Sequence, residues 1–173
     1  MDRPSPCIGL FGTCGDSKWR VPFIQRFSAL HFNFFNPQVD DWDKSFSKIE
    51  AEHLVNDEIV VFPVTDETDG IGSLSESGFS ILQALKNPQG RDFVIMIHEY
   101  VDPEKVTDPA VAKASNRARA LVMAHLEKLD MPNVFLVPTL EKMLMATDEL
   151  YRLRRQQLEI DARRVAISRF TQQ

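Results

Sequence analysis

Five short apolar runs, rich in β-branched and aromatic residues, are spaced along the chain by stretches of helical pattern. The middle run, 58–62, is apolar at every position after Glu58, which is typical of a strand buried on both faces of a parallel sheet. The other runs begin at Cys7, His31, Asp92 and Asn133. Strands that alternate with helices indicate an α/β fold in which helices cover both faces of the sheet.

The segments between these runs predict helices at residues 18–30, 45–56, 79–85 and 109–129, and a final helical region after Thr139. Phe79, Leu82 and Leu85 share the apolar side of the third of these helices, and Ser115, Asn116, Arg117 and Arg119 form a polar face of the fourth. Five strands favour a flavodoxin-like, Rossmann-like doubly wound sheet with the strand order 2-1-3-4-5. We expect one domain over residues 1–173, with a charged helical extension from about residue 140. Arginines make this extension locally basic, which is more typical of a solvated face or an oligomer contact than of a nucleic-acid site.

Composition excludes several classes of function. The chain has 173 residues and a formal charge of −5, which gives no electrostatic footprint for nucleic acid or an anionic membrane. No apolar run approaches the roughly 18 residues of a spanning helix, and the N-terminus leads straight into the first strand rather than a signal-peptide core. We therefore expect a cytoplasmic globular protein.

The two cysteines, Cys7 and Cys14, are too few and too close for a disulfide framework. No Cys/His cluster surrounds them in the sequence, so no metal site and no cofactor are predicted. His53 has no evident partner either, which favours a structural or surface role for it.

Two loops stand out as parts of a binding site. The first, Gly12 to Ser17, follows the first strand, and the second, Asp66 to Glu76, follows the third. In the order 2-1-3-4-5 these loops lie at the point where the chain reverses direction, which is where such folds bind ligands. The end of the second strand lies beside them and is followed by Asp41 and Trp42. Topology and composition therefore predict one polar pocket here.

Glu76 is the most prominent side chain of this predicted pocket. If Ser73 or Ser75 caps the following helix, Glu76 lies in its first turn. One interpretation is a surface acid stabilised by the helix dipole, and the other is a catalytic carboxylate over the cleft. The pocket has carboxylates but no metal cluster and no GxSxG elbow. A nucleophilic carboxylate paired with a second, acidic one suits chemistry at an anomeric carbon.

The sequence resembles the nucleoside 2-deoxyribosyltransferase superfamily, which includes 2′-deoxynucleoside 5′-phosphate N-hydrolases. The resemblance covers roughly residues 8–85 and rests on these segments: Gly9-Leu10-Phe11-Gly12-Thr13 with Trp19-Arg20, Asn36-Pro37 with Asp41-Trp42, Asn56-Asp57-Glu58-Ile59-Val60, and Ser73-Leu74-Ser75-Glu76-Ser77-Gly78-Phe79. Its most specific part is the pattern small-x-Glu-x-Gly, in which members of the superfamily carry a nucleophilic glutamate. The resemblance implies this role for Glu76.

The resemblance also implies roles for other residues. Asp69 corresponds to the acid that handles the proton of the base, with one residue more before the nucleophile, and Asp66 is the alternative. Glu50 corresponds to an acid that orients the deoxyribose or the base. Where the superfamily commonly has an aromatic residue after the first strand, this chain has Thr13 and Cys14. Further expected substrate contacts are Gly12, Thr13, Cys14, Ser17, Arg20, Asp41, Trp42 and Ser73.

The implied activity is transfer of 2-deoxyribose between nucleobases through a covalent intermediate on Glu76. Trp42 would stack on the base, and the loop from Gly12 to Ser17, with Arg20, could bind a phosphate. Hydrolysis of a nucleoside or its 5′-monophosphate is one alternative, and a non-catalytic nucleotide-binding or assembly module is another. Transferases complete the site with an asparagine of a neighbouring subunit, for which Asn116 is the candidate. A homo-oligomer is therefore expected, with a nucleoside or nucleotide and a free nucleobase as partners.

Overall fold

The structure is a computed structural model, and it describes residues 5–39, 45–86 and 90–171. Its centre is a five-stranded parallel sheet with the order β2-β1-β3-β4-β5. The strands are β1 (Cys7–Leu10), β2 (Asn33–Phe35), β3 (Ile59–Val64), β4 (Asp92–Ile97) and β5 (Val134–Leu136). The α/β class, the flavodoxin-like architecture and the strand order predicted from the sequence are confirmed.

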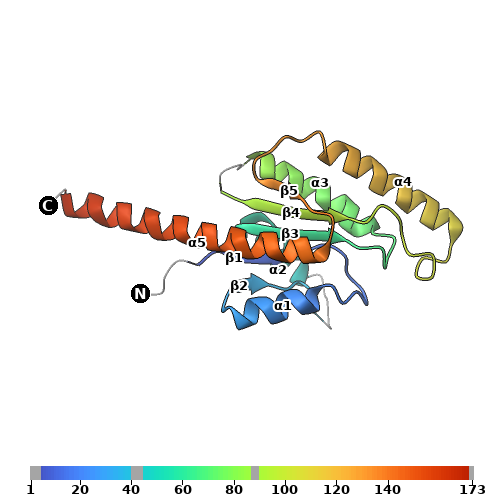
Figure 1. Cartoon of the computed structure of the whole chain (residues 1–173), viewed down its shortest axis with the longest axis horizontal. Helices are drawn as coiled ribbons and strands as arrows, with labels where there is room; N and C mark the ends of the chain where they lie inside the picture. The colour runs from blue at the N-terminus through green and yellow to red at the C-terminus, as the bar shows by residue number, and fades with distance from the viewer. Residues whose placement is uncertain (1–4, 40–44, 87–89, 172–173) are drawn as a thin grey trace.

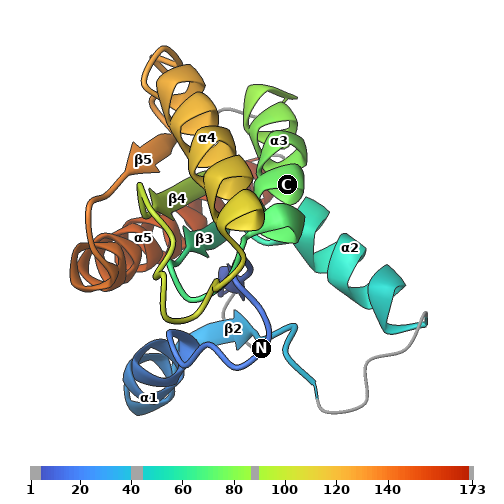
Figure 2. The same ribbon diagram turned by 90° about the vertical axis from the view of Figure 1, so that its right-hand side faces the viewer.

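Helices cover both faces of this sheet (Figure 1). They are α1 (Arg20–Ala29), α2 (Phe46–Asn56), α3 (Ile71–Lys86), α4 (Pro109–Leu126) and α5 (Leu140–Thr171). Figure 2 shows α1 and α5 on one side of the strands and α2, α3 and α4 on the other. This arrangement leaves the ends of the strands free to carry loops.

Two hydrophobic clusters fill the two sides of the sheet. Phe23 and Phe27 of α1 and Tyr151 of α5 are almost completely buried on one face of the sheet. They pack there with the side chains of β1, β3 and β4 that point to this face. Leu126 of α4 is buried with Phe62 and other residues of β3 and β4 on the opposite face. Adjacent residues of the central strands therefore point into different clusters, which explains why these runs are continuously apolar.

The boundaries of α4 and α5 follow from local chemistry. Pro109 begins α4, as predicted, and the preceding Asp108 accepts hydrogen bonds from the amides of Ala110 (2.8 Å) and Val111 (3.3 Å). α5 is 32 residues long and extends well beyond the sheet in Figure 1. Its last anchor in the core is Tyr151, whose ring stacks on Phe32 with centroids 3.8 Å apart.

Acidic side chains pair with several arginines of α5. Arg154 donates to Asp92 at 2.6 Å, Arg152 contacts Asp148 at 2.9 Å, and Arg164 lies 3.7 Å from Asp161. These pairs reduce the local positive charge that the sequence suggested. None of the helices described here is long and apolar enough to cross a membrane.

Two details of the helices differ from the sequence-based expectation. α3 begins at Ile71, eight residues before the expected helix at 79–85, and Leu82, expected in the core, is 57% exposed. Arg119 was assigned to a polar face of α4, but the structure buries it completely. Its five hydrogen bonds, described below, explain how a charged side chain is accommodated there.

Candidate active site at the carboxyl ends of the first and third strands

The loops after β1 and β3 are tied together by hydrogen bonds. The amide of Thr13 donates to the carbonyl of Pro63 at 2.8 Å. The Thr13 hydroxyl donates to the same carbonyl at 3.1 Å and accepts from the amide of Thr65 at 2.8 Å. Thr13 is completely buried. It holds the two loops side by side, and it does not itself line the two pockets described below.

Gly12 makes this close approach possible. Its φ is +96°, in the region that favours glycine, and a Cβ atom there would lie 2.4 Å from the carbonyl oxygen of Pro63. The neighbouring carbonyl cannot move away, because it accepts two hydrogen bonds from Thr13. A side chain at position 12 would therefore push the loops apart.

We expect Gly12→Ala to destabilise the fold by more than about 2 kcal/mol, because positive φ and a backbone clash add together. Gly78 of α3 provides the matched control, since a Cβ there meets nothing within 4 Å. We expect Gly78→Ala to raise stability by roughly 0.5–1 kcal/mol through helix propensity. Urea denaturation measures both changes; equal stabilities of the two variants would contradict the role assigned to Gly12.

Arg20 and Ser17 are buried beneath the first loop. Arg20 is 2% exposed and donates to the carbonyls of Leu10 (3.0 Å) and Thr13 (2.7 Å). Ser17 is 4% exposed and donates to the carboxylate of Glu67. These side chains were predicted to contact substrate. The structure places them inside the protein, where they fix the shape of the loop.

Glu76 is the sixth residue of α3 and lies in the second turn of this helix. The expectation of a first-turn position is wrong because the helix starts earlier: Asp69 accepts from the amide of Ile71 at 3.1 Å, and Gly70 at φ +68° turns the chain into the helix. The dipole effect is concentrated in the first turn. The position of Glu76 therefore gives less support to the interpretation that it is a surface acid stabilised by the helix dipole.

Two adjoining pockets share Glu76 and Cys14. One has a volume of ≈ 280 Å³ and is lined by Gly12, Cys14, Gly15, Thr68, Asp69, Gly70, Ile71, Gly72, Ser73 and Glu76. The other has a volume of ≈ 350 Å³ and is lined by Cys14, Pro37, Gln38, Val39, Glu50 and Glu76. The half-buried carboxylate of Glu76 thus lies where the two pockets meet. We call them the glycine pocket and the Glu50 pocket.

The surroundings of Glu76 make its carboxylate harder to ionise. Burial raises its pKa, the negative charge of Glu50 raises it further, and the guanidinium of Arg20 acts in the opposite direction. The two glutamates come from different helices and face one pocket. A desolvated carboxylate beside a second carboxylate is an arrangement often found at catalytic sites.

The two aspartates considered for proton transfer are placed differently. Asp69 lines the glycine pocket together with Glu76. Asp66 lies beside His98 instead, with 3.2 Å between its Oδ1 and the imidazole Nδ1. Of the two, Asp69 is the one that shares a pocket with Glu76.

The remaining predicted contacts fall into three groups. Ser73 lines the glycine pocket and is 7% exposed. Asn116 accepts from the amide of Val101 of its own chain at 2.9 Å, outside both pockets. Asp41 and Trp42 lie outside the described residues. Gln38, close before them, donates to the carbonyl of Gly15 at 3.0 Å and so ties the segment after β2 to the first loop.

Sequence reasoning missed the residue that organises the second loop. Arg119 donates to the carbonyls of Val64 (3.2 Å), Thr65 (2.8 Å), Thr68 (2.9 Å) and His98 (3.1 Å), and to the hydroxyl of Ser115 (3.0 Å). It holds the backbone immediately before Asp69. Nothing in the pattern of α4 distinguishes Arg119 from its exposed neighbour Arg117, so no sequence signal identified it.

A different group of residues could hold a metal ion. The ligand atoms of Cys7, His53 and Asp57 lie within 4.8 Å of one another. The expectation that no Cys/His cluster surrounds Cys7 is therefore wrong, because the fold places the end of α2 beside the start of β1. This group lies at the amino-terminal ends of the strands, away from Glu76.

Neither a protein-family model nor any curated protein matches this chain in the comparisons.

Proposed function

We propose that this protein cleaves the N-glycosidic bond of 2′-deoxyribonucleosides and transfers the deoxyribosyl group to a second nucleobase, with Glu76 as the nucleophile. The observation that carries the proposal is the position of Glu76 at the junction of two pockets. The anomeric carbon of a nucleoside is likewise the junction between its base and its sugar. A substrate with one half in each pocket presents this carbon to Glu76.

The lining residues suggest which half lies where. Asp69 in the glycine pocket is the acid available to the departing base. Glu50 in the other pocket can accept hydrogen bonds from sugar hydroxyls. In this arrangement the base lies in the glycine pocket and the deoxyribose in the Glu50 pocket.

The reaction then proceeds in two displacements. A carboxylate oxygen of Glu76 bonds to C1′ while the C1′–N bond breaks, and the electron pair of that bond stays on the base, which takes a proton from Asp69. The second base attacks C1′ with its ring nitrogen, returns a proton to Asp69 and releases Glu76. Two inversions give net retention. If water replaces the second base, the products are free base and deoxyribose.

A panel of 2′-deoxynucleosides and their 5′-monophosphates, each with and without free adenine, tests this proposal. Chromatography of the products distinguishes the outcomes. A new deoxynucleoside that forms only with adenine supports the transferase. Release of free base without exchange assigns hydrolysis instead. Binding of the panel without any product would favour a non-catalytic nucleotide-binding module.

Hydrolysis of nucleoside 5′-monophosphates is the second candidate, and the structure of the glycine pocket favours it. Gly70, Gly72 and Ser73 bring the start of α3 to this pocket, and the first turn of a helix offers free amide groups to an anion. A phosphate bound there would reverse the orientation and place the base near Glu50. Preference for monophosphates over nucleosides, with no exchange of bases, would select this candidate.

The charge of Glu50 yields a prediction about pH. Glu50 raises the pKa of Glu76, so removing its charge should lower that pKa. Because the nucleophile must be ionised, we expect Glu50→Gln to move the acidic limb of the kcat/KM profile to lower pH. Glu52→Gln, an exposed change on the same helix, is the control and should leave this limb in place. A shift toward higher pH in Glu50→Gln would contradict the assignment.

The oligomeric state remains a prediction, which light scattering of the purified protein would test.

A further inference from the structure

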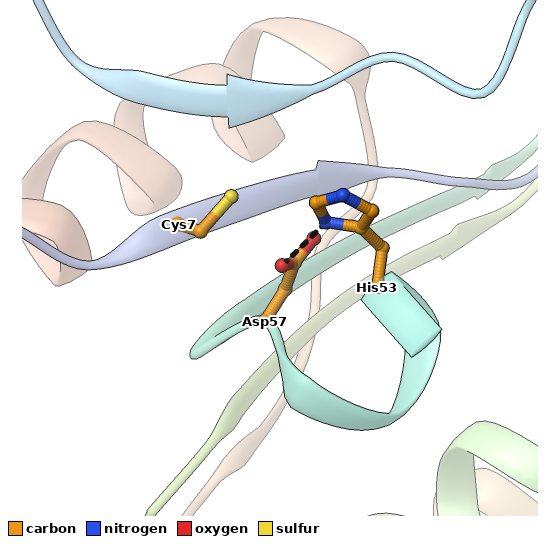
Figure 3. A group of neighbouring side chains, drawn as sticks. All are labelled: Cys7, His53 and Asp57. Atoms are coloured by element: carbon orange, nitrogen blue, oxygen red, sulfur yellow. Dashed lines mark hydrogen bonds and ion pairs between the residues drawn. The ribbon is translucent and has the colours of Figure 1, made fainter. Parts of the chain in front are cut away.

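Cys7, His53 and Asp57 meet near the amino-terminal ends of β1 and β3 (Figure 3). Cys7 is the first residue of β1, His53 lies in the last turn of α2, and Asp57 directly follows that helix. The imidazole Nδ1 of His53 is 2.9 Å from Oδ1 of Asp57. Figure 3 shows these two side chains directed toward each other, with the thiol of Cys7 beside them.

Surrounding contacts hold each of these residues in place. The ring of His53 stacks on Phe35, with centroids 3.7 Å apart and planes inclined by 2°. Arg91 donates to the carbonyl of Asp57 at 2.8 Å, and Glu58 accepts from the amide of Cys7 at 2.8 Å. The cluster is therefore positioned by the fold, so that ligands would not have to be ordered on binding.

Asp57 has an unused acceptor that points to a missing partner. The residue is 4% exposed, and its Oδ2 has no hydrogen-bond partner of normal geometry among the described residues. A buried carboxylate oxygen without a partner is costly and rare. A cation among these groups would give this oxygen a partner.

We propose that Cys7, His53 and Asp57 form a binding site for Zn²⁺ or a similar thiophilic divalent cation. A thiolate, an imidazole and a carboxylate are all zinc ligands, with bonds of about 2.0–2.3 Å. Ligand atoms within 4.8 Å of one another need to move by less than about 1 Å to reach such a geometry. Three protein ligands leave the fourth tetrahedral position to water.

Binding involves two changes in protonation. The thiol of Cys7 gives up its proton to solvent and becomes a thiolate bonded to the metal. The imidazole of His53 coordinates through Nδ1 and carries its remaining proton on Nε2. Thiolate and carboxylate together balance the charge of a divalent ion. Within the described part of the chain, Glu58 and Arg91 are the other charged groups that interact with Asp57, and they carry opposite charges.

Such a metal would join the end of α2 to β1. Glu50 lies three residues before His53 on the same helix, so the metal would also restrain the helix that contributes to the Glu50 pocket. The site itself does not depend on the proposed activity, because binding and stability can be measured without any substrate.

The test is a titration of the full chain, freed of metal with a chelator, with Co²⁺ and then Zn²⁺. We expect one Co²⁺ per chain, with a thiolate-to-cobalt charge-transfer absorption that Zn²⁺ abolishes. Cys7→Ser should remove this absorption, and His53→Gln should weaken binding at least tenfold. The matched controls are Cys14→Ser and His125→Gln, both exposed and outside the cluster, which should bind as the unaltered chain does.

Two further measurements test metal binding without relying on the absorption of the cobalt complex. Free Zn²⁺ a hundredfold above Kd should raise the unfolding midpoint by roughly 5–10 °C in the unaltered chain and not in His53→Gln. Zn²⁺ should also protect Cys7, but not Cys14, from alkylation. If Cys7→Ser fails to fold, His53→Gln tests the metal site instead, because the side chain of His53 is partly exposed and its replacement should be tolerated. Equal metal binding by His53→Gln and the unaltered chain, or no binding at all, would overturn the proposal.

Discussion

Replacing Glu76 with Gln is expected to reduce the turnover of deoxynucleosides by on the order of 10³-fold or more. The amide keeps the size of the side chain but cannot form the covalent bond to C1′. The substrate should still bind, because the walls of both pockets remain. Steady-state kinetics together with the dissociation constant of a bound substrate measure the two effects separately.

The same substitution should leave the fold intact or slightly more stable. Burial raises the pKa of Glu76, so the ionised carboxylate is less favourable in the folded than in the unfolded chain, and a neutral amide avoids this cost. Glu141→Gln, in the first turn of α5, is the matched control for the loss of one helical carboxylate and should keep full activity. Full activity of Glu76→Gln would exclude it as the nucleophile, whereas loss of folding would identify a structural carboxylate.

Arg119→Met should have the largest effect on stability, a loss of roughly 3–5 kcal/mol. The guanidinium is completely buried and donates to four carbonyls and one hydroxyl. Methionine fills much of the volume but leaves these acceptors without a donor, and unpaired buried carbonyls are costly. The free energy of unfolding from urea denaturation measures this loss.

Arg117→Met tests whether the effect is specific, because Arg117 is exposed and two residues away on α4. We expect this control to change stability by less than about 0.5 kcal/mol. Arg119→Lys keeps the charge but offers fewer donors, so its stability should fall between those of Arg119→Met and the unaltered chain. A loss of less than 1 kcal/mol in Arg119→Met would mean that the loop before Asp69 does not depend on this arginine.

Much of the fold could be predicted because the same local pattern, an apolar run followed by a helical segment, occurs several times along the chain. The five apolar runs and the intervening helical segments specify alternating strands and helices, and right-handed crossovers restrict how these can be arranged. The predicted order 2-1-3-4-5 is the observed one. Pro109 marked the start of α4 for a local reason, since proline at the first helical position needs no hydrogen bond.

The start of α3 was less predictable because competing local signals lie close together. Serines at 73 and 75 are good capping residues, yet the chain uses Asp69 and Gly70 and begins the helix at Ile71. Arg119, from another helix, donates to the carbonyl of Thr68 just before this start. A sequence pattern confined to the loop does not contain that contact.

The sequence by itself determined the class of fold, the strand order and the pair of loops that flank the pocket of Glu76. These follow from the periodicity of apolar residues and from the order of the strands along the chain. Only the tertiary structure decided which polar residues of those loops reach a pocket. It buried Thr13, Ser17 and Arg20 as internal hydrogen-bonding partners. It also brought Cys7 and His53 together across 46 residues of sequence, from position 7 to position 53. Such groupings depend on how helices dock on the sheet, which no local pattern encodes.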